Sequence, residues 1–337
     1  MTASVSDACE TERKNMIMNT LCALAIGFVL DALLGDTTVG RFLPGLIKKY
    51  ITAVDSRIKN AYADSKEARN AAGGMFEFIV LLSAVIPSLG LYILGYLISN
   101  VTGILVESVL CAAALSIRNS RTLAAQIMRS LQKNDLESAR EYFTELTGMN
   151  AQGLDSQDIV RCTLESASAN ITDHAVAPVF WIGLLGGVGG FVYRCVNTAD
   201  RVGGRMGGYE DTSARVPTAI NRFFTFVPSR IAAKLCVADG SLLLLDSKNA
   251  SQTVKRFAAD SANKNAAQTQ AACAGLLDIS IDSGYPNSVI MTLGKETQTP
   301  GTTSIYWINQ LISGSSVFML LLVAALRVGL FFLMRYI

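Results

Sequence analysis

Histidine, tryptophan and ionised side chains are scarce in this chain of 337 residues, which has one His, two Trp and 17% charged residues. Half of its residues are hydrophobic, and its mean hydropathy is +0.36. Such values are more usual for a multi-span membrane protein than for a soluble enzyme. A basic patch is also missing, because Lys and Arg are spread through the polar stretches between apolar blocks. Nucleic-acid binding is therefore not expected.

Several motifs of known chemistry are absent. The chain has no GxSxG string and no GxxxxGK[ST] loop, and its GGVGG string (186–190) lies inside an apolar run. Any nucleotide would therefore be held by another arrangement. The seven cysteines form no CxxC pair, and no Cys cluster accompanies His174. A zinc site is not expected, and scattered cysteines of this kind are typical of small buried residues in a reducing compartment.

Long apolar blocks dominate the chain. Each has close to the ~20 residues that a helix needs to cross the hydrocarbon core. The blocks are Met16–Leu34, Phe76–Ile98, Val101–Ile117, Val176–Val196 and Val317–Ile337. They predict an all-α, polytopic integral membrane protein with about four or five membrane helices plus amphipathic cytoplasmic helices. The first block lacks an A-x-A-like cleavage signal, so we interpret it as an uncleaved membrane helix.

We expect a single membrane-embedded domain over residues 1–337. Its parts are a polar tail (1–19), three membrane helices with a cytoplasmic loop (20–117), an amphipathic helical region (118–175), a motif-bearing apolar segment (176–209), a cytoplasmic or interfacial region (210–316) and a last membrane helix (317–337). Within these parts, 118–146 predicts a helical pair bent near Asn134, and Phe223–Leu245 predicts an amphipathic helix because Pro228 and charged residues interrupt it.

The segment Val176–Val196 allows two structures. Lys and Arg are frequent in all three long polar regions, so the positive-inside tendency places all three in the cytoplasm. A full crossing by Val176–Val196 would put the last two regions on opposite sides. A re-entrant hairpin that turns within Gly186–Gly190 would bring both ends to one side. In the alternative, Gly183, Gly186, Gly187 and Gly190 are small packing residues in an ordinary spanning helix.

Polar residues crowd both ends of this segment. Helical spacing would place Ser166, Asn170 and Asp173 on one face, with Glu165 adjoining. After the segment, Asn197 and Asp200 are one turn apart, and glycines and arginines follow. Oxygen ligands with arginines and no thiolate cluster favour Mg²⁺ and phosphate. Alternatively, these groups cap helix ends and pair across a polar interface. Asp31 and Arg327, inside apolar blocks, raise the question of a functional site as well.

Three strings carry a family resemblance: LDALLGD (30–36), LDSQDIVRCTLESASANITDHAVAPVFW (154–181) and YRCVNTADRVGGRMGGY (193–209). They resemble the CobD/CbiB family of cobalamin-biosynthesis membrane proteins, the adenosylcobinamide-phosphate synthases. The likeness continues in the same order over most of the chain, through KNDLESAREYF (133–143) and VPSR (227–230). The resemblance implies a carbon–nitrogen ligase that joins adenosylcobyric acid to aminopropanol phosphate or ethanolamine phosphate, using ATP and Mg²⁺. It also implies a multi-pass protein of the inner (cytoplasmic) membrane.

The resemblance also implies roles for particular residues. The expected catalytic residues are Glu165, Asn170, Asp173, Asn197 and Asp200; the expected binding residues are Gly204, Arg205, Tyr209 and Arg230; and the expected metal ligands are Asp36, Asp173 and Asp200. The implied partners are a corrinoid, a phosphorylated amino alcohol and membrane lipid, without nucleic acid. A homo-oligomer and a complex with other corrinoid-pathway membrane enzymes both stay open.

Three departures from the family pattern leave a second function open. Arg41-Phe42-Leu43-Pro44 replaces an expected His-Pro pair, and Asn221-Arg222 replaces a pair of aspartates. Gln270 stands where an acid is expected, and an amide is neither an acid nor a strong cation ligand. The alternative is a non-catalytic or regulatory membrane paralogue of the same superfamily, similar to AmpE. A transporter is less favoured, because no internal symmetry is visible.

Overall fold

A computed structural model describes residues 2–61, 66–205, 212–283, 291–295 and 298–336. The elements are α1 (Thr2–Leu34), α2 (Thr38–Ala61), α3 (Lys66–Ile98), α4 (Asn100–Ala114), α5 (Ile117–Gln132), α6 (Leu136–Thr147), α7 (Ser156–Asn170), the π-helical turn η1 (Ile171–Val176), α8 (Ala177–Asp200), the π-helical turn η2 (Arg201–Arg205), η3 (Thr212–Ala214), α9 (Arg215–Leu242), α10 (Ser247–Phe257), α11 (Ala266–Leu277), β1 (Ile281–Ser283), β2 (Met291–Leu293) and α12 (Thr302–Tyr336). The antiparallel pair β1–β2 is a small exception to the predicted all-α fold.

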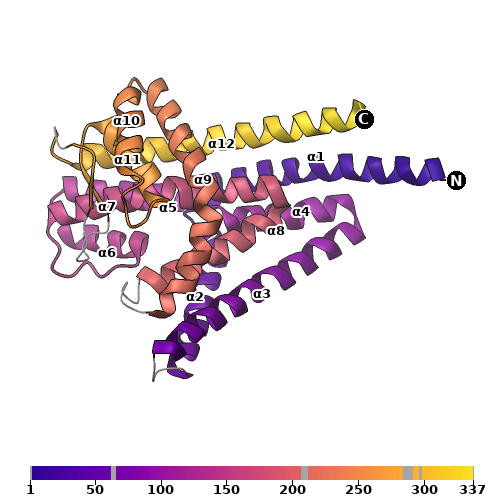
Figure 1. The fold of residues 1–337 in the computed structure, drawn as a ribbon, viewed down its shortest axis with the longest axis horizontal. Coiled ribbons are helices and arrows are strands. Elements are labelled where there is room, and N and C mark those ends of the chain that lie inside the picture. Colours follow the sequence, from indigo (N-terminus) through magenta and orange to yellow (C-terminus); the bar gives the residue numbers. More distant parts are fainter. Residues whose placement is uncertain (1, 62–65, 206–211, 284–290, 296–297, 337) are drawn as a thin grey trace.

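Long apolar helices form one end of the molecule. Five segments of the described chain are long and apolar enough to cross a membrane: Met16–Leu34, Ala68–Ile98, Asn100–Gln132, Ser156–Gly203 and Thr302–Leu333. The helices α1, α3, α4 and α12 extend toward the end of the molecule that also holds both termini (Figure 1). Ser99 joins α3 to α4, and its side chain accepts a hydrogen bond from the backbone N–H of Thr102. The predicted membrane helices and the tight turn between the second and third blocks are thus confirmed.

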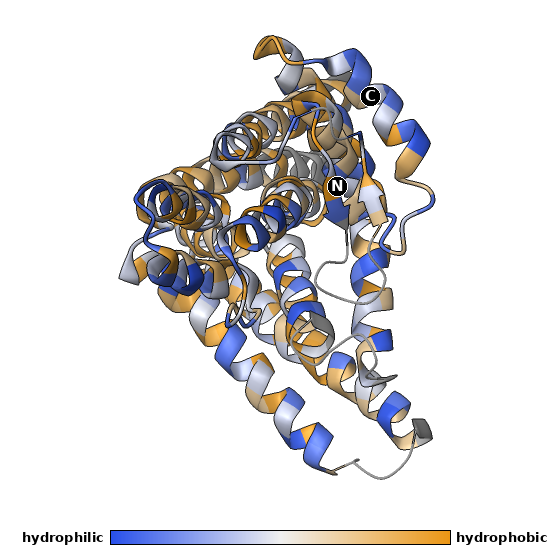
Figure 2. Ribbon diagram, turned by 90° about the vertical axis from the view of Figure 1, so that its left-hand side faces the viewer, coloured by the Kyte–Doolittle hydropathy of each residue, from blue (hydrophilic) through white to orange (hydrophobic). Residues whose placement is uncertain are grey.

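Shorter, more polar helices form the opposite end, which carries α6, α7, α10 and α11 (Figure 1). Viewed from this end, hydrophilic residues are frequent in the nearest helices and loops (Figure 2). Local capping explains where several of these helices begin. Asp135 caps α6 through the N–H of Ser138, and Asp155 forms a capping box with Asp158 at the start of α7. The predicted helical pair is α5 and α6, with the bend at Asn134, which has a φ of 57°.

The helix α8 is folded back on itself at Gly186. This residue has φ 72° and ψ −170°, a conformation that only glycine adopts without strain. A Cβ placed on Gly190 would lie 2.3 Å from Cγ1 of Ile182, although eight residues of straight helix span ~12 Å. Below the turn, the hydroxyl of Tyr193 donates to the carbonyl of Asp173 at 3.3 Å. The predicted hairpin, with its turn within Gly186–Gly190, is confirmed, and its two ends lie at the same end of the molecule.

Two charged side chains, the buried Glu107 and the half-buried Arg327, bind the backbone at the hairpin tip. Glu107 of α4 accepts a hydrogen bond from the N–H of Gly187 at 3.0 Å, where the second half-helix begins. Arg327 of α12 donates to the carbonyl of Gly183 at 3.0 Å, where the first half-helix ends. Each charge opposes the partial charge of the helix end that it contacts. The irregular backbone at the tip therefore has polar partners inside an apolar helical bundle.

The folded hairpin also explains how the Lys- and Arg-rich regions before and after α8 can lie on the same side. Because α8 returns to the end from which it came, the polar regions before and after it lie at the same end of the molecule as α6 and α7 (Figure 1). The predicted amphipathic helix at Phe223–Leu245 belongs to α9, which runs across the bundle rather than along it. All three Lys- and Arg-rich regions can therefore face one compartment, as the positive-inside tendency requires.

Asp239 of α9 makes the stability of the fold depend on pH. Its carboxylate packs against Gly314 of α12 so closely that a Cβ there would lie 2.1 Å from either oxygen. Burial raises the pKa of Asp239 from 3.8 to about 6. The folded state then binds more protons than the unfolded state between these values, so stability falls as pH rises from about 4 to 6. We expect Asp239→Asn to remove this loss and to raise the melting temperature at pH 7.

Thermal unfolding in detergent between pH 4 and pH 7.5 measures this effect. Asp260→Asn is a matched control, since Asp260 is exposed. An unaltered slope in Asp239→Asn would show that this carboxylate is ionised at little cost.

Candidate functional site

The two motif-bearing segments meet at the base of the hairpin. Arg201, the first residue of η2, donates through Nη2 to Oδ1 of Asn170 at 2.6 Å, and Asn170 donates to Oγ of Ser120 at 3.0 Å. Asn170 is fully buried. These bonds connect the end of α7, the end of α8 and the start of α5. Both motif segments contain a π-helical turn at this point, a feature frequently found at functional sites.

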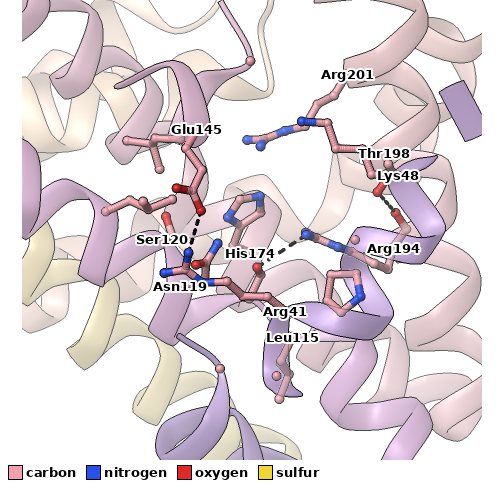
Figure 3. A pocket seen from close by; sticks show the side chains of 18 of the residues that line it. Arg41, Lys48, Leu115, Asn119, Ser120, Glu145, His174, Arg194, Thr198 and Arg201 are labelled. Atoms are coloured by element: carbon pink, nitrogen blue, oxygen red, sulfur yellow. Dashed lines mark hydrogen bonds and ion pairs between the residues drawn. The ribbon is translucent and has the colours of Figure 1, made fainter. Parts of the chain in front are cut away.

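A cavity of about 280 Å³ opens beside this junction. Its charged or potentially charged lining residues are Asp31, Arg41, Lys48, Glu145, His174, Arg194 and Arg201. The side chains of Arg41, Arg194 and Arg201 converge there from α2, α8 and η2, with His174 between them (Figure 3). One cation is neutralised, because Nη1 of Arg41 pairs with Glu145 at 2.8 Å. The remaining positive charge would suit an anionic ligand.

Arg194 is the cavity residue most in need of a partner. Its Nη2 lies 3.4 Å from Oγ of Ser116, whereas the buried Nη1 has no hydrogen-bond partner among the described residues. A buried guanidinium with an unused donor is costly, and a phosphate or carboxylate oxygen would satisfy it in good geometry. Asp31, also on the lining, is buried and accepts a hydrogen bond from the backbone N–H of Arg118 at 3.1 Å.

Asp200 and Asn197 lie at the hairpin base but do not line the cavity. Asp200 accepts hydrogen bonds from Oγ1 of Thr218 at 2.6 Å and from Nδ2 of Asn221 at 2.7 Å, both on α9. Asn197 is 1% exposed, and neither atom of its amide has a partner among the described residues. Asp173, in η1, carries the carbonyl that Tyr193 contacts. The structure thus brings together Asn170, Asp173, Asn197 and Asp200 around one helical junction.

The remaining predicted site residues lie elsewhere or outside the described residues. Glu165 is on α7, and its carbonyl accepts a hydrogen bond from Nε2 of Gln270 at 3.3 Å. Arg230 lies over the ring of Phe226 at 3.7 Å and bonds Oδ1 of Asn265 at 3.2 Å. The backbone of Gly204 and Arg205 belongs to η2. Tyr209 lies outside the described residues.

Asp36 does not share a site with the other two predicted metal ligands. It accepts hydrogen bonds from Nε of Arg118 at 2.9 Å and Oγ1 of Thr122 at 3.0 Å. Slight desolvation raises the pKa of Asp36, but the bonds from Arg118 and Thr122 outweigh it and leave that pKa below its usual value. Among the described residues, no group of three His, Cys, Asp or Glu side chains could hold a metal ion. The predicted trio Asp36, Asp173 and Asp200 therefore does not converge.

Of the cationic wall of the cavity, the sequence indicated only Arg201, among the arginines that follow Asp200. Arg194 interrupts an apolar run, and an ionisable residue in such a run is itself a signal of function. Arg41 stood out in the sequence only as a departure from the family pattern. No local signal marks Lys48, because its place beside the hairpin base depends on how α2 packs.

These features define a class: an α-helical membrane protein with a helical hairpin, whose base holds a cation-lined cavity. The family model described as CobD/Cbib protein matches residues 24–312. The chain belongs to this family.

Curated relatives are similar over most of their length. The probable cobalamin biosynthesis protein CobD of Methanothermobacter thermautotrophicus is 30% identical over 270 residues, covering 79% of this chain and 85% of the relative. The cobalamin biosynthesis protein CobD of Clostridium perfringens is 27% identical over 262 residues, covering 76% and 80%. That of Klebsiella pneumoniae is 28% identical over 272 residues, covering 80% and 83%. No solved structure matches significantly.

Proposed function

We propose that this protein is a ligase of cobalamin biosynthesis. In this proposal it joins adenosylcobyric acid to aminopropanol phosphate or ethanolamine phosphate at the expense of ATP, giving adenosylcobinamide phosphate at the cytoplasmic face of the inner membrane. Membership of the CobD/CbiB family and the names of the curated relatives support a place in this pathway. The corrinoid and the phosphorylated amino alcohol would then be its partners within the membrane lipid.

The cation-lined cavity at the hairpin base carries the proposal. An amino alcohol phosphate has a dianionic phosphate at one end and an amine at the other. The lining offers Lys48, Arg194 and Arg201 for the phosphate and the buried carboxylate of Asp31 for the amine. Arginine binds phosphate oxygens through parallel N–H donors, so it positions as well as attracts the group. The chain would in this way orient the amine for attack on an activated corrinoid carboxyl group.

Magnesium fits this proposal through the oxygen chemistry at the junction. When bound, Mg²⁺ would neutralise phosphate charge and so favour transfer from ATP. Asp200 and Asn197 supply carboxylate and amide oxygens, which suit a hard cation. Because no three acidic side chains converge in the described residues, water and substrate phosphate would complete the coordination.

Product formation tests the proposal. Protein purified in detergent is given adenosylcobyric acid, ATP, Mg²⁺ and either amino alcohol phosphate, and the amide is sought by mass spectrometry. The expected result is the condensed product with ADP or AMP. A competent family member in parallel serves as the positive control. Its activity, with none from this chain, would overturn the proposal and favour the non-catalytic, AmpE-like paralogue, in line with the amides at Asn221 and Gln270.

The amino alcohol phosphate is expected to depend on Lys48. Removing this charge with Lys48→Gln should raise KM for the amino alcohol phosphate about 10-fold, since one charge-assisted hydrogen bond contributes ~1.5 kcal/mol. The KM for ATP should stay the same. Lys49→Gln is a matched control, because the neighbouring Lys49 is exposed and does not line the cavity. Equal KM values in the two variants would place the phosphate elsewhere.

A further inference from the structure

Glu77 of α3 has no role in the site as described so far. It is 1% exposed, and neither carboxylate oxygen has a hydrogen-bond partner among the described residues. The buried Glu107 differs, because it accepts hydrogen bonds from Tyr96 and from the N–H of Gly187. A buried acid without a partner is strongly unfavourable. An unsatisfied group of this kind in a folded protein calls for a bound ion, water or ligand.

A second carboxylate lies close to Glu77. The charge of Asp200 acts on Glu77, and Phe76 of α3 packs in one cluster with Ala199 of α8 and Val202 of η2. A Cβ on Gly203 would lie 3.6 Å from the ring of Phe76, the residue before Glu77. No basic side chain in the described residues forms an ion pair with either carboxylate. The buried Glu77 and the half-buried Asp200 therefore lack a compensating positive charge.

Two asparagines place amide oxygens close to Asp200. Asn197 precedes Asp200 by one helical turn and is buried with its Oδ1 unpartnered. Asn221 donates through Nδ2 to Asp200 at 2.7 Å, and its own Oδ1 is buried without a partner. The unsatisfied atoms at this point are thus mainly oxygens, which accept and do not donate. A cation satisfies such a set, whereas a further acceptor does not.

We propose that Glu77 and Asp200, assisted by the amide oxygens of Asn197 and Asn221, hold a divalent cation of the Mg²⁺ type at the junction of α3, α8 and α9. Two carboxylates balance its charge, and Mg²⁺ commonly keeps several waters beside one or two carboxylates. Glu77 is the new ligand, which no sequence pattern indicated. Cation binding at this site does not depend on the proposed function, but the role of the cation in catalysis rests on it. Asp200 immediately precedes Arg201 of the cavity wall, so the cation would lie beside the phosphate-binding residues.

Metal binding to the substrate-free protein tests this site. The probe is Mn²⁺, titrated into the full chain in detergent and followed by electron paramagnetic resonance, with the melting temperature measured in parallel. We expect Glu77→Gln and Asp200→Asn to weaken Mn²⁺ binding at least 10-fold and to lose the metal-dependent rise in melting temperature. Ser83→Ala, also on α3, is the matched control, since the Ser83 hydroxyl bonds only its own helix.

A variant that binds Mn²⁺ more tightly would show that changes in affinity do not arise from misfolding. Asn221→Asp adds a third carboxylate beside Asp200 and should tighten Mn²⁺ binding about 10-fold or more. Wild-type affinity in Glu77→Gln, or weaker binding in Asn221→Asp, would overturn the site. Because ATP and corrinoid are absent from this experiment, the cation site can fail while amide formation is observed, and it can stand where no amide forms.

Discussion

Replacing Arg201 with Gln is expected to lower kcat/KM for amide formation about 100-fold. Arg201 lines the cavity, and its Nη2 is held by Asn170 at 2.6 Å. A fixed guanidinium that contacts a reacting phosphorylated group commonly contributes ~3 kcal/mol, which corresponds to about two orders of magnitude in rate. Arg201→Lys should recover only part of this loss, because an ammonium group cannot donate two parallel hydrogen bonds.

Steady-state kinetics with both amino alcohol phosphates measures the effect. The exposed Arg57 of α2 offers a matched control, and Arg57→Gln should keep wild-type kinetics. A melting temperature for each variant separates loss of contact from loss of fold, since Arg201 also links α7 to α8. If folded Arg201→Gln protein kept the wild-type kcat/KM, the hairpin base would not be the site of the reaction.

The sequence predicted the membrane helices because their signal is local. A run of about 20 apolar residues requires a helix of that length in a bilayer, and α1, α3 and α12 follow the predicted blocks. By contrast, local sequence signals could not distinguish a hairpin from a spanning helix in segment 176–196. Gly183 and Gly190 do pack as small residues, against Val323 and Ile182. The hairpin also needs polar partners at its tip, and those partners, Glu107 and Arg327, lie 80 and 144 residues away in the sequence.

The site was predicted only in part, for the same reason. Asn170, Asp173, Asn197 and Asp200 meet at the junction because the folded α8 brings its two ends together. Helical spacing and family resemblance were enough to select them. Two of the cavity cations, Arg41 and Lys48, come from α2, whose position depends on tertiary packing rather than on any motif. Glu77 was missed because a single acid near the start of an apolar helix resembles an ordinary interfacial residue until its burial is known.

The hairpin tip should be the most sensitive point of the fold. Arg327→Met would leave Glu107 as a buried charge without its oppositely charged neighbour and would free the carbonyl of Gly183. Glu107→Gln would leave the guanidinium in the same position. Leaving a buried polar group without its hydrogen-bond partner costs about 1–3 kcal/mol, and more where the group is charged, which is a large part of the stability of a typical domain. We expect each variant to lower the melting temperature sharply. The double variant should cost less than the sum of the two, because the charges compensate each other.

Gly186→Ala tests the turn itself. Its φ of 72° and ψ of −170° are strained for any residue with a Cβ, and the added atom would lie 2.8 Å from Oε1 of Glu107. Gly329→Ala on α12 is the matched control, since a Cβ there meets nothing within 4 Å. It should be neutral or stabilising, as alanine favours helix by up to ~1 kcal/mol over glycine. If α8 were a straight spanning helix, alanine would stabilise the protein at both positions. Cysteines introduced at positions 173 and 197 would then be labelled by reagents on opposite sides of the membrane. Only the hairpin predicts both a large loss of stability in Gly186→Ala with none in Gly329→Ala, and labelling of positions 173 and 197 from the same side.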